Sequence, residues 1–272
     1  AVMQRNPQLK AMIHLTGQLK NHVDRQCLED GLVVTNWGDV PALSVAEATL
    51  MMTLASLRRA CYWCDQLHHH GAWRGASLDA ENRWAPQGLF DRTLGLYGFG
   101  LIGRAFVKLI KPFGLKPLVF TGWMTDEEEA EYGVERVDSL EALCRRCDVL
   151  SVHTGMRDDT RHSLNAKTLS LLPDGSHVIN TARGGIIDEQ ALVAELKSQR
   201  LFAALDVFEE EPLPEDHPFR GLPNCMLIPH HGGPTIDYAV RCGATAVDQV
   251  ERFGRGEPLL HRLSLKQYDR MT

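Results

Sequence analysis

The feature that most constrains the fold is a glycine-rich run, Gly98-Phe-Gly100-Leu-Ile-Gly103, which fits the pattern G-x-G-x-x-G. It directly follows the apolar segment 94–97, typical of a buried strand, and opens the segment 101–113, whose periodicity predicts a helix. In this context Gly98 allows a tight turn, Gly100 lets the backbone approach a pyrophosphate, and Gly103 lets the helix pack on the strand. The free amides at the helix start would hold the phosphates. The pattern therefore predicts a dinucleotide site; the alternative is a glycine-rich turn without a ligand.

Strands and helices alternate along the rest of the chain. Further strands are expected at 116–120, 149–152, 177–180, 203–207 and 226–228, and helices at 140–147, 189–199 and 235–253. Near-continuous apolar strands between helices predict a parallel sheet covered on both faces. Towards the N-terminus, strands are expected at 10–14 and 32–35. A long helix is expected from Ser44 to Gln66, with Ser44 and Glu47 as a capping box.

Composition narrows the class of protein. A chain of 272 residues suits two modest domains or one large one, and 44% hydrophobic residues are ample for a core. The net charge of −6 argues against nucleic acid or an anionic membrane as a partner. The longest nearly apolar run, 48–57, is shorter than the ~18 residues of a membrane span. Seven scattered cysteines fit a reducing compartment, so we expect a cytoplasmic protein.

The choice of dinucleotide depends on the strand after the glycine loop. It should end in an acidic residue for the ribose hydroxyls of NAD, but it ends in Thr121. No Lys or Arg follows to hold the 2′-phosphate of NADP, and the acidic run 126–129, expected in a solvated loop or at a helix start, would repel one. Arg157 is the one candidate partner for that phosphate. We expect NAD and leave NADP open.

Three polar segments follow predicted strands. They contain Arg183, the pair Asp206 and Glu211, and His230. Residues just past the carboxyl ends of parallel strands surround the ligand crevice. Arg can grip a carboxylate, and a carboxylate beside a His raises the pKa of that His, which then donates protons near neutral pH. Singly, these residues could be a surface cation, an acid in a proline turn and a His bonded to backbone. Together they indicate a catalytic site.

At this point the chain resembles the D-isomer-specific 2-hydroxyacid dehydrogenases, the family of glyoxylate/hydroxypyruvate reductases and D-3-phosphoglycerate dehydrogenase. The resemblance implies an α/β fold in which a Rossmann-type doubly wound parallel sheet is inserted into a smaller flavodoxin-like substrate domain. The NAD(P)-binding domain would cover 44–235, and 1–43 and 236–272 would form the substrate domain. Family members begin with several dozen further residues, so we expect that domain to be truncated. A homodimer through the long helix is also implied. The matching runs are Ser44–Glu47, Gly98–Gly103, Asn180–Gly185, Leu205–Phe208 with Glu211-Pro212, and Pro229-His230.

The resemblance implies reduction of a 2-oxo acid to the (R)-2-hydroxy acid by NAD(P)H, or the reverse. Arg183 would bind the substrate carboxylate and polarise its carbonyl. His230 would give a proton to the carbonyl oxygen, and Glu211 would raise the pKa of His230. Asp206 would orient the nicotinamide through its carboxamide. Other cofactor contacts, beside the three glycines, Thr121, Arg183 and His230, are expected at Leu101, Ile102, His153, Gly155, Thr160, Thr181, Ala182 and Gly232.

The substrate loop departs from the family pattern. Leu19 stands in place of a Gly, and Asn21 in place of an Asp. Substrate contacts are still expected from Gln18 and Leu19, with Arg183 and His230. Lys20 or His22 could reach a second anionic group, the alternative being a solvated loop. His231, where the family has an apolar residue, is either a packing variant or a further substrate contact.

Three alternatives stay open: a non-catalytic nicotinamide-sensing regulator of the same fold, a formate- or phosphite-type dehydrogenase on the same scaffold, and a metal-binding module. The pairs Cys61-x-x-Cys64 and Cys144-x-x-Cys147, with His68–His70, imitate a zinc site. Both pairs lie on expected helices, far apart in the chain, unlike the ligand pairs of zinc ribbons. We therefore expect no metal and assign these cysteines to packing.

Overall fold

The computed structural model describes residues 6, 8–15, 19–20, 22–73 and 84–270. The chain divides into two compact units. One consists of Ala1–Ser44 with Pro234–Thr272, and the other of Val45–Gly233. The larger unit is thus inserted between the two segments of the smaller one.

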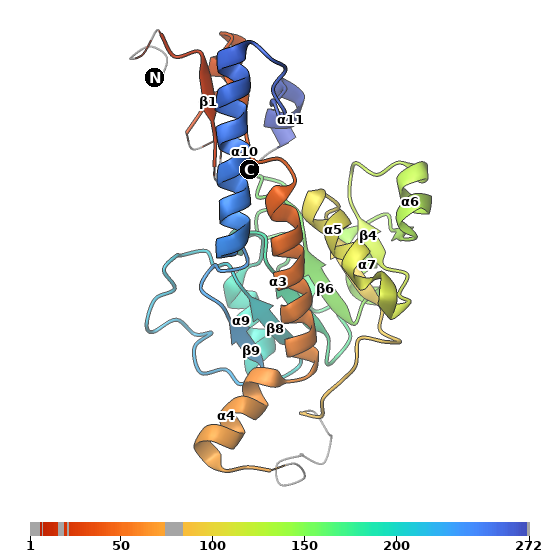
Figure 1. The fold of residues 1–272 in the computed structure, drawn as a ribbon. Coiled ribbons are helices and arrows are strands. Elements are labelled where there is room, and N and C mark those ends of the chain that lie inside the picture. Colours follow the sequence, from red (N-terminus) through yellow and green to blue (C-terminus); the bar gives the residue numbers. More distant parts are fainter. Residues whose placement is uncertain (1–5, 7, 16–18, 21, 74–83, 271–272) are drawn as a thin grey trace. The chain divides into compact units, whose positions relative to one another are not determined.

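The larger unit contains a seven-stranded, wholly parallel sheet in the order β5-β4-β3-β6-β7-β8-β9. The chain starts in the middle at β3, moves outward to β5, and then returns to β6 on the other side of β3. Figure 1 labels β4, β6, β8 and β9 of this sheet. This reversal makes the sheet doubly wound, which confirms the predicted fold class. The strands are β3 Leu94–Tyr97, β4 Leu118–Phe120, β5 Glu135–Arg136, β6 Val149–Val152, β7 His177–Asn180, β8 Phe202–Leu205 and β9 Cys225–Leu227.

The central strands are apolar because both faces of the sheet are covered. Every residue of β3, β6, β7 and β8 is buried. One core cluster joins these strands to the helices that follow them, with Leu143, Leu150 and Leu192 fully buried. The helices after β3 are α5 Leu101–Ile110, α6 Asp126–Tyr132, α7 Leu140–Arg146, α8 Ala166–Leu169 and α9 Glu189–Lys197, with short 3-10 turns η1 Lys111–Phe113 and η2 Gly184–Ile186.

The single long helix predicted from Ser44 to Gln66 is wrong, because two helices occupy this region. They are α3 Val40–Leu57 and α4 Ala60–His70. Between them Arg59 has a φ of 55°, a left-handed conformation that a right-handed helix cannot continue through. The predicted capping box is also wrong, since Ser44 is buried inside α3 and its hydroxyl accepts a hydrogen bond from the Thr235 amide.

The apolar segment around helix α3 is longer than the run 48–57 identified from the sequence. Its 18 residues have a mean hydropathy of 1.5, and by length and composition alone they could cross a membrane. Core helices of soluble proteins pass the same test. Ala46, Met52 and Leu57 of this helix are buried.

The smaller unit combines both ends of the chain. Strands β1 Ala11–Ile13 and β2 Val33–Thr35 form a parallel pair. Its core includes Leu19, Val23 and Tyr268, and the Tyr268 hydroxyl donates to the Val23 carbonyl at 2.6 Å. The helices of this unit are α2 Arg25–Glu29, α10 Ile236–Arg255 and α11 Leu265–Arg270.

The cysteines are all free, and their predicted role holds for one pair only. Cys144 and Cys147 are buried in the core, as expected of small apolar residues. Cys61 and Cys64 are exposed on α4, so their assignment to packing is wrong. Within the described part of the chain, no three His, Cys, Asp or Glu side chains gather as a metal site.

Candidate active site

The glycine loop between β3 and α5 has the clearances that a pyrophosphate needs. Gly98 has a φ of 98°, and a Cβ added there would lie 2.5 Å from the Thr154 amide nitrogen. A Cβ on Gly103 would lie 3.2 Å from the Gly98 carbonyl oxygen, whereas one on Gly100 would meet nothing within 4 Å. At Gly98 and Gly103 the loop packs too tightly against its neighbours for a side chain, whereas the space beside Gly100 is open. These residues fit a dinucleotide, with the start of α5 supplying the amides.

Beside this loop, the segment after β6 presents His153. Its Nε2 lies 2.9 Å from the Ser151 hydroxyl, and its Nδ1 is buried without a partner among the described residues. Burial lowers the pKa of His153 to about 3, so the ring is neutral at physiological pH. A neutral ring with an unused nitrogen suits a polar ligand better than an anionic one.

The loop continues through a turn closed by Thr160. The Thr160 hydroxyl donates to the Gly155 carbonyl at 2.7 Å and accepts from the Arg157 amide at 2.8 Å. The Arg157 guanidinium donates to the Asp159 carboxylate at 2.9 Å. The one arginine considered for a 2′-phosphate is thus already paired with an acid.

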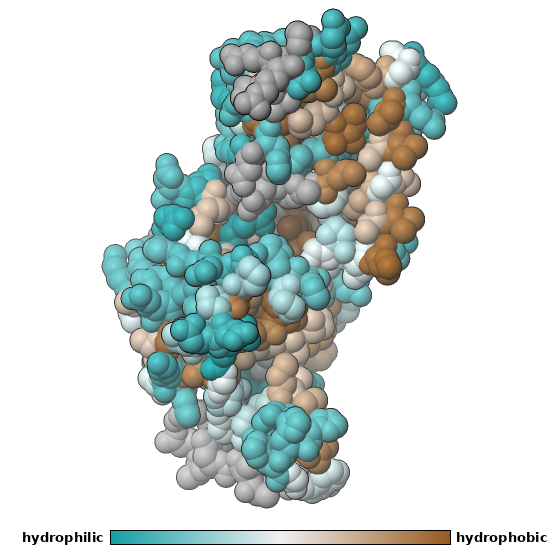
Figure 2. Space-filling model, turned by 90° about the vertical axis from the view of Figure 1, so that its left-hand side faces the viewer, coloured by the Kyte–Doolittle hydropathy of each residue, from teal (hydrophilic) through white to brown (hydrophobic). Residues whose placement is uncertain are grey.

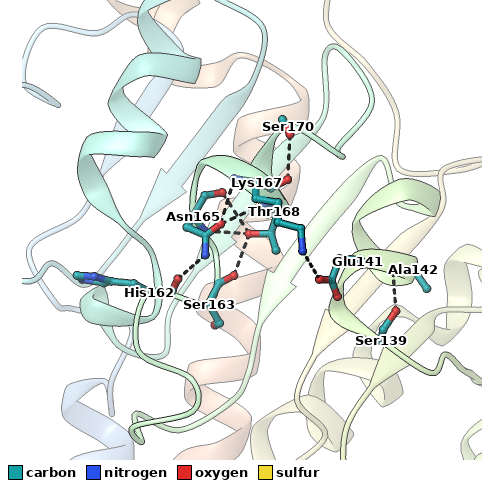
Figure 3. A network of polar contacts seen from close by, with 9 residues as sticks. All are labelled: Ser139, Glu141, Ala142, His162, Ser163, Asn165, Lys167, Thr168 and Ser170. Carbon is teal, nitrogen blue, oxygen red and sulfur yellow. Dashed lines mark hydrogen bonds and ion pairs between the residues drawn. The ribbon is translucent and has the colours of Figure 1, made fainter.

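Helix α8 anchors the far end of the same segment. Asn165 caps the helix by accepting from the amides of Lys167 and Thr168, and the Thr168 hydroxyl accepts from the Asn165 amide (Figure 3). Lys167 also reaches Glu141 of α7 at 3.3 Å. The cap holds the start of α8, and the exposed Lys167–Glu141 pair adds one contact with the neighbouring helix.

Arg183 follows β7 in a turn organised by Asn180. The Asn180 carboxamide accepts from the Ala182 amide at 3.0 Å and donates to the Arg183 carbonyl at 2.9 Å. The Arg183 guanidinium donates to the Ala182 carbonyl at 2.6 Å, while its Nε is buried without a partner in the described structure. Burial lowers the pKa of Arg183, and the charge of Glu211 opposes this effect. A half-buried cation with an unused donor is suited to bind a carboxylate.

The turns after β7 and β8 are packed directly on each other. A Cβ added to Gly184 would lie 1.9 Å from the carbonyl carbon of Phe208, so only glycine allows this approach. Phe208 begins the turn that carries Glu211, and its amide donates to Glu211 Oε1 at 3.0 Å. Arg183 and Glu211 are therefore held in one arrangement by backbone contact.

Glu211 in turn holds His230, which follows β9. Glu211 Oε2 lies 2.6 Å from His230 Nδ1. The His230 amide donates to the Asp206 carbonyl at 2.8 Å, and its φ of 52° is left-handed. The ring is 47% exposed, so it is fixed at one nitrogen and accessible to a ligand.

Asp206 is almost completely buried, and it fixes the segment that carries the histidine. Its Oδ1 accepts from the His231 amide at 2.7 Å and its Oδ2 from the Gly232 amide at 2.9 Å. A Cβ on Gly232 would lie 2.6 Å from Oδ2, so glycine is required there. Burial raises the pKa of Asp206, and the two amide hydrogen bonds oppose that rise. In this arrangement Asp206 faces the chain's own backbone.

The remaining expected residues are distributed more widely. Leu101 is exposed and Ile102 half-buried at the start of α5, and Thr121 directly follows β4. The Thr181 hydroxyl bonds that of Thr49 in α3 at 2.8 Å. In the smaller unit, the Leu19 side chain is fully buried in the core, so any contact with substrate would come from its backbone. Gln18 and Asn21 lie outside the described residues.

Sequence reasoning missed Glu209. This residue contacts His162, and lies 3.8 Å from Arg161, both on the loop after β6. Its amide donates to Glu189 of α9 at 2.9 Å. Glu209 therefore links the turn after β8 to the loop after β6 and to α9. The only available signal was its place in the acidic run before Pro212, because nothing in the spacing pairs it with a histidine 47 residues away.

Known proteins resemble this chain in sequence and in fold. Residues 50–232 match the family model described as "D-isomer specific 2-hydroxyacid dehydrogenase, NAD binding domain". The chain is 35% identical over 230 residues to the D-3-phosphoglycerate dehydrogenase of Methanocaldococcus jannaschii, covering 84% of this chain but only 42% of that protein. It is 32% identical over 263 residues to a glyoxylate reductase of Aeropyrum pernix, covering 94% and 76%. The solved structure of the TT0316 protein from Thermus thermophilus superposes with a TM-score of 0.83 at 30% identity, covering 97% of this chain and 81% of that one.

Proposed function

The chain belongs to the D-isomer specific 2-hydroxyacid dehydrogenase family, and we propose that it reduces a 2-oxo acid to the (R)-2-hydroxy acid with NADH, or catalyses the reverse reaction. The observation that carries this proposal is the connected set Arg183, Glu211 and His230. A half-buried guanidinium with an unused, buried Nε donor and a half-exposed imidazole bonded to a carboxylate lie on adjoining turns at one edge of the sheet. These groups match the two tasks of the reaction: binding a carboxylate and moving a proton.

His230 acts as the acid in this proposal. A carboxylate can only accept, so the hydrogen bond to Glu211 places a proton on His230 Nδ1. Nε2 is then the nitrogen that gives a proton to the carbonyl oxygen during reduction and takes it back in the reverse direction. Because Glu211 is itself bonded to the Phe208 amide, the ring cannot rotate without breaking this chain of contacts.

Arg183 binds and orients the substrate. Its planar guanidinium can hold the carboxylate of the 2-oxo acid and polarise the adjacent carbonyl. The bound nicotinamide supplies the hydride, and the protein supplies orientation and charge. Asp206 keeps the backbone of His231 and Gly232 in place, and we assign to it the orientation of the nicotinamide as well.

Two further parts of the proposal concern the oligomeric state and the cellular compartment of the protein. We infer a homodimer through the segment from Ser44 to Gln66, which spans most of α3 and the first part of α4, as the family resemblance implies. We also infer a reducing, cytoplasmic compartment, which is supported by seven free cysteines.

The test is oxidation of NADH and NADPH, followed by the loss of nicotinamide absorbance, with glyoxylate, hydroxypyruvate, pyruvate, phenylpyruvate and a phosphorylated 2-oxo acid. His230→Ala is expected to lower kcat by about 10²–10⁴-fold, the contribution of general acid catalysis, while the Kd of NADH is retained. His68→Ala, which changes an exposed histidine of α4, is the control and should keep full activity. Binding of NADH without turnover of any oxo acid would instead favour the non-catalytic sensor.

A further inference from the structure

The turn that carries Arg183 is bonded through its backbone to the loop after β6. The His162 amide donates to the Gly185 carbonyl at 2.9 Å, and the Leu164 amide donates to the Ile186 carbonyl at 3.1 Å. The two segments thus pair like short parallel strands. Because Gly185 is only two residues from Arg183, the position of this loop bears directly on the turn that presents the guanidinium.

His162 is held in a backbone conformation that is uncommon for a residue other than glycine. Its φ of 47° lies in the left-handed region, which persists at such a residue only where the surroundings enforce it. Its carbonyl accepts from the Asn165 carboxamide at 3.0 Å (Figure 3), and its ring Nε2 contacts the Glu209 carboxylate. The amide, the carbonyl and the ring of His162 are therefore each bonded to a different partner.

Glu209 lies directly against the two glycines that follow Arg183. A Cβ added to Gly185 would lie 3.6 Å from Glu209 Oε1, and one added to Gly184 would lie 2.4 Å from the Glu209 amide nitrogen. The same carboxylate contacts the ring of His162, whose amide is bonded to Gly185. Glu209 therefore packs on the Arg183 turn and also holds the loop that pairs with this turn.

Helix α9 fixes the backbone of Glu209. Its first residue, Glu189, accepts from the Glu209 amide at 2.9 Å through Oε1, and Glu189 Oε2 lies 3.2 Å from His217 Nε2. Burial raises the pKa of Glu189, and the Glu209 amide and the charge of His217 oppose this rise. The side chains of Glu209 and His162 are more open to solvent, at 34% and 42% exposed. The turn after β8 lies on the left-hand side of Figure 1, the side that faces the viewer in Figure 2, where hydrophilic residues cover much of the surface.

We propose that Glu209 is a positioning residue for the binding of the substrate carboxylate. By holding His162 against Gly185, it keeps the Arg183 turn between the loop after β6 and the turn after β8. The guanidinium is then presented in one orientation, which reduces the ordering cost that substrate binding must overcome. This inference rests on the proposed function, since it assumes that Arg183 binds the carboxylate of a 2-oxo acid.

The first test measures kcat and KM for the 2-oxo acid that the wild-type chain reduces best, together with the Kd of NADH and the Tm. Glu209→Ala is expected to raise KM about tenfold, within the coupling range of residues in one network, because binding by Arg183 weakens equally in the ground and transition states. The values of kcat, its pH profile and the Kd of NADH should stay unchanged. Glu209→Gln retains an oxygen that can accept from His162 and should restore most of the affinity. Glu210→Ala, at the exposed next residue of the same turn, is the matched control and should change nothing.

The second test uses two double-mutant cycles to locate the effect. His162→Asn tolerates the left-handed backbone, but its shorter side chain would not reach Glu209. It should raise KM as much as Glu209→Ala does, and the double variant should be no worse than either single one. Arg183→Lys keeps a charge but loses the planar fork, so in that background Glu209→Ala should raise KM by less than about twofold.

Several results would overturn the inference while leaving the reductase intact. They are additive effects in either cycle, a KM that responds to Glu209→Ala no more than to Glu210→Ala, and a fall in kcat with a shifted pH profile. The last result would place the effect on His230 and Glu211 instead of Arg183. A lower Tm with an unchanged KM would assign Glu209 to stability alone and would also overturn the inference. Failure of the wild-type chain to reduce any 2-oxo acid would overturn the proposed function as well.

Discussion

Close backbone contacts between neighbouring turns build the candidate site residue by residue. Gly184 lets the turn of Arg183 rest on the carbonyl of Phe208, and Gly232 lets its own amide reach Asp206. His230 and its partner Glu211 are therefore positioned by residues that have no chemistry of their own. The same close packing leaves His153 behind the glycine loop, where it titrates abnormally.

The buried His153 predicts a pH dependence of stability. Its folded pKa is about 3 against an ordinary value of 6.5, so between these limits the unfolded chain binds a proton that the folded chain does not. The contribution of His153 to stability is therefore expected to be constant above about pH 6.5 and to fall on acidification below it, by up to about 1.4 kcal/mol per pH unit. Urea unfolding at pH 7 and pH 5 measures the loss. His153→Gln should reduce the difference between the two pH values, and an unchanged difference would assign the acid sensitivity to other groups.

At the scale of elements, the strands were easier to predict than the helix ends. The ranges of β3, β6 and β7 were confirmed to the residue, because a buried strand in a parallel sheet has a predominantly apolar sequence bounded by polar or turn residues. The acidic run 126–129 does begin a helix, α6. The short elements α2, α8, α11 and β5 were missed. Each has two to six residues, too few to show a period.

Helix α8 provides a test of what holds such a short element. Asn165→Ala removes the side-chain cap and is expected to cost about 1 kcal/mol, a fall in Tm of about 2–4 °C. Lys167→Ala removes only an exposed ion pair with Glu141 and should change stability by less than about 0.5 kcal/mol. Both are measured by thermal unfolding. Equal effects of the two substitutions would show that the cap does not stabilise α8.

At the scale of the whole molecule, the chain consists of two units with separate cores. The glycine loop and the residues Arg183, Glu211 and His230 all belong to the larger unit, Val45–Gly233. Binding of the cofactor and the positioning of the proton donor are thus properties of one insertion within the chain.

This organisation predicts where NADH will stabilise the molecule. At a free concentration of about 100 times its Kd, a ligand stabilises the unit that binds it by about 2.7 kcal/mol. Hydrogen exchange should therefore slow in β3, α5 and the other central strands of the larger unit. Amides of β1 and β2 in the smaller unit should exchange at nearly unchanged rates. Equal protection of both units would show that they unfold as one.

The sequence was most informative where function depends on local pattern. The glycine spacing after β3 predicted the cradle, and the order of Arg183, Glu211 and His230 after successive strands indicated the catalytic set. It was less informative about Glu209, which meets its histidine only through folding.

By itself, then, the sequence determined the alternation of elements, a parallel sheet covered on both faces and the identity of the polar residues at the strand ends. These follow from hydrophobic period and from the rule that parallel strands present their carboxyl ends at one edge. Only the tertiary structure decided the break of the long helix at Arg59, the burial of Ser44 within α3, and the pairing of Arg104, Arg136 and Arg157 with acids. Those outcomes depend on which distant side chains come within a few ångströms, and no local pattern encodes such a distance.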